Sequence, residues 1–232
     1  MIAENIAKIR ENMVRAALAA GRRPEEILLC AATKMNDAAR VREAVAAGVD
    51  CCGENRVQEL TQKLSEHAYD GAPVHFIGHL QTNKVKQVVG KVSLIQSVDR
   101  LELLRCIEHE AEKQGILQDI LLEVNVAAEE SKSGFTPELA PEIAAQMVEY
   151  PHCRLRGLMA IPPISEKNGD NCRYFAEMRN LFVDISAKKY DNVSMDCLSM
   201  GMSGDYPDAI REGATLVRVG TAIFGARNYN QV

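Results

Sequence analysis

Lys34 is the residue whose type and position most clearly offer chemistry. It directly follows an apolar run over residues 27–33, which is typical of a buried strand. A strand there predicts that the amine lies among small apolar neighbours, where partial loss of water lowers its pKa. More of the amine is then free base, the form that attacks a carbonyl carbon. The alternative is a solvated lysine at a strand end, without a chemical role.

Two loops near the carboxyl terminus are rich in residues that bind phosphate. The first contains Gly201, Ser203 and Gly204, where glycines allow close backbone approach and the serine supplies a hydroxyl. The second contains Gly220 and Thr221, whose N–H groups begin a predicted short helix and favour an anion. Each loop alone is also typical of an ordinary turn. Together with an amine, they favour an aldehyde phosphate held as a Schiff base, and pyridoxal 5'-phosphate (PLP) is the natural candidate.

Three further residues are candidates for contacts with the ring of such a ligand. Arg218 closes the last predicted strand, and its guanidinium can only donate hydrogen bonds. Facing a pyridine nitrogen, it would keep that nitrogen unprotonated and make the ring a poor electron sink; the alternative is a salt bridge to a carboxylate. Asn55 is predicted to donate to the ring hydroxyl oxygen. Met159 is predicted to pack either on a ring face or in the protein core.

Two other features at predicted strand ends have weaker claims to a role. His79 is a candidate general base, although a histidine at the rim of a site is more often a surface hydrogen-bonding group. The segment 125–134 is polar, and Ser131, Lys132 and Gly134 are predicted to form a lid. The sequence therefore predicts a binding site without an assigned catalytic residue.

These residues must be positioned by a regular alternation of strands and helices. Apolar residues at three- and four-residue steps predict an amphipathic helix at the start of the chain, ending near Gly21. Apolar runs then alternate with helical patterns, and they cover 27–33, 49–52, 74–78, 92–97, 119–125, 154–160, 194–198 and 215–219. Such units in 232 residues predict a (β/α)8 TIM barrel, with an extra N-terminal helix, as a single domain over residues 1–232. An open doubly wound sheet is the alternative.

Several helix ends are also readable in the sequence. Asp37 is a predicted N-cap for a helix that ends at Gly48. Asp99 and Glu102 have the spacing of a capping box, which predicts a helix that ends at Gly115. In a (β/α)8 barrel, ligands bind at the carboxyl ends of the strands, and phosphate commonly binds after the last two. The candidate amine and both phosphate loops fall at those ends.

The composition limits the partners and the compartment. A net charge of −5 and a pI near 5.6 argue against a nucleic-acid partner. The chain shows neither a signal-peptide pattern nor an apolar stretch that spans a bilayer, so we expect a cytoplasmic location and no membrane partner. Seven cysteines without a Cys-x-x-Cys pair, and five histidines without metal-ligand spacing, predict reduced thiols and no metal site.

In combination, these motifs resemble the pyridoxal phosphate homeostasis protein family. The matching stretches run through nearly the whole chain and cover 33–34, 53–59, 75–78, 80–84, 131–134, 155–162, 198–203 and 217–227. The resemblance implies a PLP fold-type III barrel, similar to the N-terminal domain of alanine racemase but without the β-domain of that enzyme. It also implies that Lys34 forms the Schiff base and that Ser203, Gly220 and Thr221 hold the phosphate. Arg218 would then lie near the pyridine nitrogen.

The function that this resemblance implies is a PLP binder that buffers, carries or delivers the cofactor without robust turnover. Apo forms of PLP-dependent enzymes are candidate recipients, and we expect a monomer because the domain that dimerises the racemases is missing. A racemase or lyase acting on amino acids is the alternative, although racemases of this fold need a second base. Neither Tyr206 nor Tyr229 has an evident route to a substrate. A barrel enzyme for sugar or other phosphates is a third hypothesis.

Overall fold

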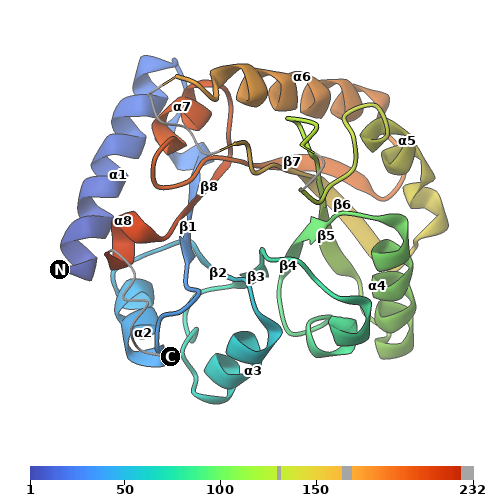
Figure 1. Cartoon of the computed structure of the whole chain (residues 1–232), viewed down its shortest axis with the longest axis horizontal. Coiled ribbons are helices and arrows are strands. Elements are labelled where there is room, and N and C mark those ends of the chain that lie inside the picture. Colours follow the sequence, from blue (N-terminus) through green and yellow to red (C-terminus); the bar gives the residue numbers. More distant parts are fainter. Residues whose placement is uncertain (130–131, 164–168, 226–232) are drawn as a thin grey trace.

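Strands and helices alternate along the chain and close into a parallel barrel. The computed structural model describes residues 1–129, 132–163 and 169–225. Within these residues each strand pairs with the next in chain order, and β8 pairs with β1 to close the barrel (Figure 1). The predicted (β/α)8 barrel is confirmed, and the open sheet is wrong because no strand edge is left between β8 and β1 in this part of the chain.

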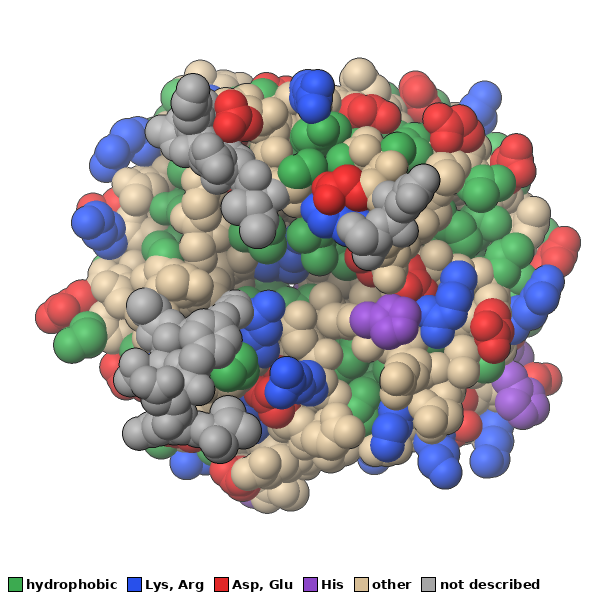
Figure 2. All heavy atoms as spheres, viewed as in Figure 1, with side chains coloured by type: hydrophobic (Ala, Val, Ile, Leu, Met, Phe, Trp, Pro, Cys, Tyr) green, Lys and Arg blue, Asp and Glu red, His purple; other side chains and the backbone are tan. Residues whose placement is uncertain are grey.

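The strands are short and surround the centre of the molecule. They are β1 Leu28–Ala32, β2 Cys51–Glu54, β3 Val74–Phe76, β4 Leu94–Val98, β5 Gln118–Glu123, β6 Cys153–Met159, β7 Val193–Ser199 and β8 Leu216–Val219. Every predicted apolar run overlaps one of them, and the differences are confined to the ends. Figure 2 shows that the molecule is hollowed at its centre in this view, with Lys and Arg side chains beside the hollow.

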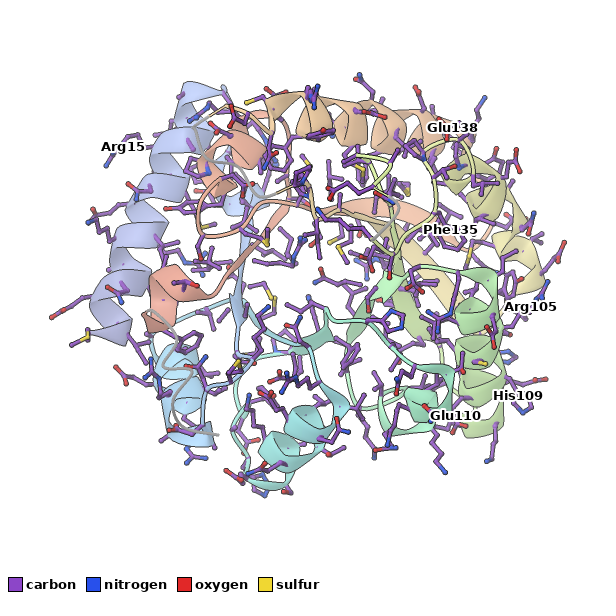
Figure 3. All side chains as sticks on the ribbon, in the orientation of Figure 1. Arg15, Arg105, His109, Glu110, Phe135 and Glu138 are labelled. Carbon is purple, nitrogen blue, oxygen red and sulfur yellow. The ribbon has the colours of Figure 1, made fainter. Side chains whose placement is uncertain are left out.

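The helices lie outside the strands and cover the barrel. They are α1 Ile2–Ala19, η1 Pro24–Glu26, α2 Ala38–Ala46, α3 Val57–Ser65, η2 Thr82–Gln87, α4 Leu101–Gln114, α5 Ala140–Ala145, η3 Gln146–Glu149, α6 Cys172–Lys188, α7 Tyr206–Arg211 and α8 Thr221–Phe224. The predicted N-terminal helix is confirmed as α1, which packs on α7, α8 and α2. Arg15 on α1 and Arg105 on α4 point away from the barrel (Figure 3). None of the helices in the described residues is both long and apolar enough to cross a membrane.

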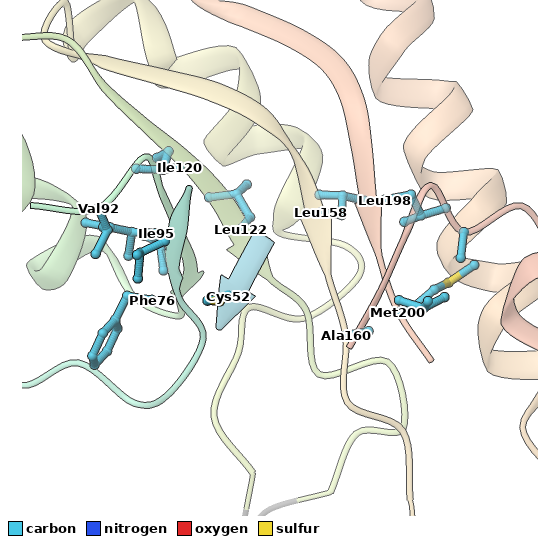
Figure 4. Packing of buried hydrophobic residues seen from close by; sticks show 14 of the residues in the cluster. Cys52, Phe76, Val92, Ile95, Ile120, Leu122, Leu158, Ala160, Leu198 and Met200 are labelled. Carbon is cyan, nitrogen blue, oxygen red and sulfur yellow. The ribbon is translucent and has the colours of Figure 1, made fainter. Parts of the chain in front are cut away.

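Successive residues of the strands face two different cores. Ile95 and Leu122 belong to the large cluster between strands and helices (Figure 4). Leu94 and Leu121, their neighbours in the sequence, belong to a separate cluster inside the barrel. This alternation follows from the two-residue period of a strand. Because both faces are buried, the strands appear in the sequence as nearly continuous apolar runs.

The predicted N-cap is confirmed for α2 but not for α4. Asp37 accepts a backbone N–H of the first turn and caps α2, as predicted. Gly115 ends α4 in a left-handed conformation, with a φ of 65°. The predicted capping box is wrong, because Arg100 is the N-cap of α4. The Asp99 carboxylate instead contacts His79 and Arg100.

Candidate functional site

The closed barrel brings the candidate amine of Lys34 and the predicted phosphate loops to one edge. Ala32, the last residue of β1, pairs with Gly53 of β2. On the other side, a Cβ atom built on Gly220 would lie 3.4 Å from the Ala32 carbonyl oxygen. Lys34 after β1 and Asn55 after β2 therefore leave the barrel beside the loop that follows β8. We call Lys34, Asn55, Ser203, Arg218, Gly220 and Thr221 the mouth site.

A buried ion pair holds the segment that carries Lys34. The Lys63 ammonium donates to the Thr33 carbonyl at 2.9 Å and lies 2.7 Å from Glu54 Oε2. The Glu54 side chain is fully buried, and it also accepts hydrogen bonds from the hydroxyls of Thr33 and Tyr69. Buried charges persist when they are paired and hydrogen-bonded, as these are. The protein thus fixes the end of β1 before any ligand arrives.

The turn directly after Lys34 has an unusual backbone. Met35 has a φ of 59°, in the left-handed region that residues with a side chain seldom adopt. Glu59 accepts the Met35 N–H at 2.7 Å, and the same carboxylate oxygen lies 3.1 Å from Lys63. Strained backbone persists only where its surroundings hold it, and it is common at functional sites. The network that pairs Lys63 therefore also sets the direction in which the chain leaves Lys34.

Ser203, Gly220 and Thr221 meet at the amino end of α8. The Ser203 hydroxyl oxygen accepts the backbone N–H groups of Gly220 and Ala222, each at 3.3 Å. Gly220 is the N-cap of α8, and Thr221 is its first residue, with an exposed side chain. Convergent N–H groups at the start of a helix are an arrangement that binds phosphate oxygens. The two predicted phosphate loops are therefore side by side.

Arg218 lies inside the barrel below these loops and is 4% exposed. Its guanidinium donates to the Ser199 hydroxyl and, at 2.8 Å, to the Ala160 carbonyl. Burial lowers its pKa from the usual value, while the charge of Glu123 acts in the opposite direction. The alternative that we considered, a salt bridge to a rim carboxylate, is not formed within the described residues.

A chain of hydrogen bonds continues from Arg218 through the barrel. The Ser199 hydroxyl donates to Gln96 Oε1 at 2.6 Å, and Gln96 Nε2 lies 2.8 Å from His75 Nδ1. Burial lowers the pKa of His75 to about 4, so the imidazole is neutral near pH 7. Side chains of β8, β7, β4 and β3 are therefore connected across the interior.

Glu123 is a charged residue of the mouth to which the motifs assign no role. It ends β5, and burial raises the pKa of its carboxyl to about 7, with a further increase from Asp99 and a decrease from Arg218. A carboxyl with such a pKa can hold or release a proton near neutral pH. The sequence signal was an acid that interrupts an otherwise apolar strand.

Asn55 has an unsatisfied polar atom that fits a ligand. Its side-chain oxygen is buried without a hydrogen-bond partner. A Cβ atom on Gly78 would lie 2.2 Å from the Asn55 carbonyl oxygen, so a glycine is required for the β3 loop to approach this closely. An unpaired buried amide costs free energy, which a polar ligand group recovers. The buried Asn55 oxygen can accept a hydrogen bond from a ligand, and the N–H groups near Ser203 are of the kind that bind an anion.

Met159 and His79 have the environments of a core residue and of a rim residue, respectively. Met159 is fully buried and packs against Leu94 and Leu121 inside the barrel, which is the core position that we considered for it. His79 is 55% exposed at the rim, and its Nδ1 lies 3.1 Å from Asp99. Its environment is that of a surface hydrogen-bonding group.

The loop after β5 is tied down where the structure describes it. Lys132 lies 2.7 Å from the Glu129 carboxylate, and its ammonium is 3.5 Å from the Ile161 carbonyl after β6. A Cβ atom on Gly134 would lie 2.6 Å from the Asn125 nitrogen, so the loop folds back closely on itself. Ser131, the third residue of the predicted lid, is outside the described residues.

Comparisons with known proteins agree with this geometry. The family model for the alanine racemase N-terminal domain matches residues 4–228. A pyridoxal phosphate homeostasis protein of Pseudomonas aeruginosa is 43% identical over 228 residues, which cover 98% of this chain and 96% of the relative. Its counterpart in Aquifex aeolicus is 42% identical over 226 residues, covering 97% and 98%.

Solved structures give the same result. PipY of Synechococcus elongatus with PLP bound is 32% identical, with a TM-score of 0.83 over 97% of this chain and 100% of that one. An alanine racemase of Clostridium difficile is 15% identical, with a TM-score of 0.68 over 100% of this chain and 58% of that one; at this identity it shows the fold alone.

The barrel and the mouth site thus define a protein of the alanine racemase N-terminal domain type. Within that class, the chain is 42–43% identical to pyridoxal phosphate homeostasis proteins over nearly their whole length. The chain belongs to the pyridoxal phosphate homeostasis protein family, and the resemblance expected from its motifs is confirmed.

Proposed function

We propose that this chain binds PLP at the mouth site and takes part in PLP homeostasis by buffering, carrying or delivering the cofactor. One observation carries the proposal. Lys34, the converging N–H groups at Ser203 and the buried Arg218 occur at one end of one barrel. A protein of the same fold and family, PipY, has been solved with PLP bound.

Each mouth residue has a distinct role in this proposal. Lys34 supplies the amine that bonds to the aldehyde carbon. Ser203, Gly220 and Thr221 bind the phosphate. The unpaired Asn55 Oδ1 accepts a hydrogen bond from the ring hydroxyl. Met159, which is fully buried in the core inside the barrel, has no role in this proposal.

Arg218 explains why binding need not lead to turnover. PLP supplies an aldehyde and a ring that withdraws electrons from a bonded amino acid, most strongly when the ring nitrogen is protonated. The Arg218 guanidinium can only donate, so a pyridine nitrogen that faces it stays unprotonated. Its position is fixed by the Ser199 hydroxyl and the Ala160 carbonyl. The site therefore holds the cofactor while weakening its use as an electron sink.

The tyrosines support the same conclusion. Tyr206 is 5% exposed, and its hydroxyl lies 3.2 Å from the Asn12 amide on α1, on the outer side of the barrel. A second proton-transfer base for racemisation would have to face the mouth instead. Tyr229 is outside the described residues. Apo forms of PLP-dependent enzymes are the proposed recipients, and a monomer is the proposed state.

Turnover by the loaded protein separates this proposal from its alternatives. The purified chain with PLP is incubated with single amino-acid enantiomers, and chiral chromatography follows the other enantiomer. We expect no sustained racemisation, and we expect an apo PLP-dependent enzyme to gain activity when the loaded chain is added. Sustained racemisation that Lys34→Ala abolishes would instead establish the racemase. A chain without visible absorbance after PLP is added would favour the sugar-phosphate enzyme.

A further inference from the structure

Three side chains of the kind that bind transition metals meet inside the barrel, where one is paired in register with Arg218 and another is connected to it by hydrogen bonds. Cys30 of β1, Cys51 of β2 and His75 of β3 are all buried, and their ligand atoms lie within 4.8 Å of one another. The strands that carry them are neighbours, and Cys30 pairs with Cys51 in register. We propose that these residues, the thiol cluster, bind a zinc ion.

The spacing of the cluster suits tetrahedral zinc. With Zn–S bonds of about 2.3 Å and Zn–N bonds of about 2.0 Å, tetrahedral ligand atoms lie roughly 3.3–3.8 Å apart. The ligand atoms already lie within 4.8 Å of one another, so changes of side-chain rotamer are enough to reach these distances. Two sulfurs and one imidazole are ligands that zinc prefers over magnesium or calcium. Three protein ligands leave the fourth position for water.

His75 is held in place by a second residue. Gln96 contacts Nδ1 at 2.8 Å, so Nε2 is the ring nitrogen left for a metal. A ligating imidazole usually donates its other N–H to a neighbouring acceptor, which fixes the ring. In the structure Gln96 Nε2 faces Nδ1, while Gln96 Oε1 accepts the Ser199 hydroxyl. Zinc on Nε2 requires the flipped amide, whose oxygen accepts the Nδ1 proton and leaves the Nε2 lone pair for the metal.

An open cavity reaches His75, one of the three residues of the cluster. It has a volume of about 420 Å³ and is lined by His75, Leu94, Cys197 and Leu216 near the amino ends of the strands. Leu216 packs directly against Cys30 and Cys51. Asp119, Arg156 and Asp196 line the same cavity, and Arg156 forms an ion pair with each aspartate, so a hydrated ion meets a polar opening.

Binding is an exchange of protons for metal, without redox chemistry. Zinc binds the thiolate form of cysteine, so each of the two cysteines must lose its proton on binding. Two S–H bonds break as two Zn–S bonds form, and two protons leave through the cavity to water. The lone pair of the neutral imidazole completes the protein ligands.

Linear spacing gives no sign of this cluster, because each ligand comes from a different strand. The five histidines and the cysteines show no short zinc motif, and barrel closure alone brings these three together. Cys52 offers a matched control. It is as buried as its neighbour Cys51, but it belongs to the cluster between strands and helices (Figure 4).

The test measures metal bound by the reduced full-length chain. Zinc affinity is obtained by competition with a chromophoric chelator, and cobalt(II) is used as a spectroscopic probe for thiolate ligands. We expect about one zinc per chain, and a thiolate-to-cobalt band in the near ultraviolet. Cys30→Ala, Cys51→Ala and His75→Ala should weaken zinc at least about tenfold, whereas Cys52→Ser should keep it. Circular dichroism confirms that each variant is folded.

Three outcomes would overturn the proposal. The first is a folded, reduced wild-type chain that shows no cobalt–thiolate band, which does not depend on any variant. The second is zinc retained at full affinity by Cys30→Ala and Cys51→Ala. The third is zinc lost from Cys52→Ser as completely as from Cys51→Ala. None of these results depends on PLP, so the proposed function stands or falls separately.

Discussion

The two ends of the barrel differ in where their polar side chains lie, on loops at one end and on strands at the other. At the mouth site, Lys34 and Ser203 lie on loops beyond the strands, and ion pairs and backbone N–H groups hold these loops. In the thiol cluster, Cys30 and His75 lie on the strands themselves, among leucines. Loop residues bind through a geometry that the local backbone supplies, whereas strand residues converge only because the barrel closes. The first kind of site is visible in a linear motif, and the second is not.

One chain of hydrogen bonds joins the two regions. It runs from Arg218 through Ser199 and Gln96 to His75. Each member is less than one-tenth exposed, and bonds between buried groups are stronger than those in water. A change at one end of this chain of hydrogen bonds is therefore expected to affect the other end.

The largest effect is expected from Lys63→Met, which removes the cation under the mouth site. Glu54 is fully buried and would be left without its charge partner, at a cost of about 3–5 kcal/mol in the free energy of unfolding. Urea denaturation measures this change. The double variant Lys63→Met with Glu54→Gln should recover much of the loss, and a double variant as unstable as the single one would contradict the ion-pair account.

Gln96→Leu tests the link between the two regions. It leaves His75 Nδ1 and the Ser199 hydroxyl without their partner. We expect zinc affinity to fall about 10–100-fold, because the ligand ring is no longer oriented. Chelator competition measures this change, and Gln114→Leu on the exposed side of α4 is the control. Unchanged zinc affinity would show that the cluster does not depend on this chain of bonds.

Ser203→Ala and Thr221→Ala test the phosphate end alone. Each should weaken PLP binding by about 1–3 kcal/mol, because a hydrogen bond to a charged group is lost. Absorbance titration measures the affinity for PLP, and zinc affinity should stay unchanged in both variants. If both variants bind PLP as tightly as wild type, the anion is held elsewhere.

The smallest effect concerns Glu123 and pH. Its folded pKa of about 7 is above its unfolded value, so the protonated form is favoured in the folded chain. Its contribution to stability is fully present below about pH 4.5 and is lost as pH rises through 7. The loss is on the order of 1–2 kcal/mol, allowing for partial exposure. Glu123→Gln should flatten this part of the stability profile of the PLP-free chain, and an unchanged slope would contradict the assignment.

The parts of the fold that the sequence predicts are those set by local patterns. Apolar runs predict the strands because each strand is buried on both faces. Gly115 predicts a helix end because it adopts a left-handed conformation. Asp99 failed as a cap because a tertiary contact with His79 competed for its carboxylate, and no local pattern contains that contact.

The candidate site divides in the same way. The sequence predicts Lys34 and the phosphate loops, because strand ends and glycine-rich turns are local features. It does not predict the role of Lys63, whose partners Thr33 and Glu54 lie in other elements of the chain. The raised pKa of Glu123 also depends on burial and on Asp99, which only the folded chain brings near.

Reduction of the PLP-loaded chain with borohydride, followed by peptide mass spectrometry, identifies the lysine that bonds to the cofactor. We expect a reduced pyridoxyl group on Lys34, its absence in Lys34→Ala, and its persistence in the surface variant Lys91→Ala. A label that lies mainly on another lysine, or a wild-type chain that takes up none at saturating PLP, would contradict this expectation.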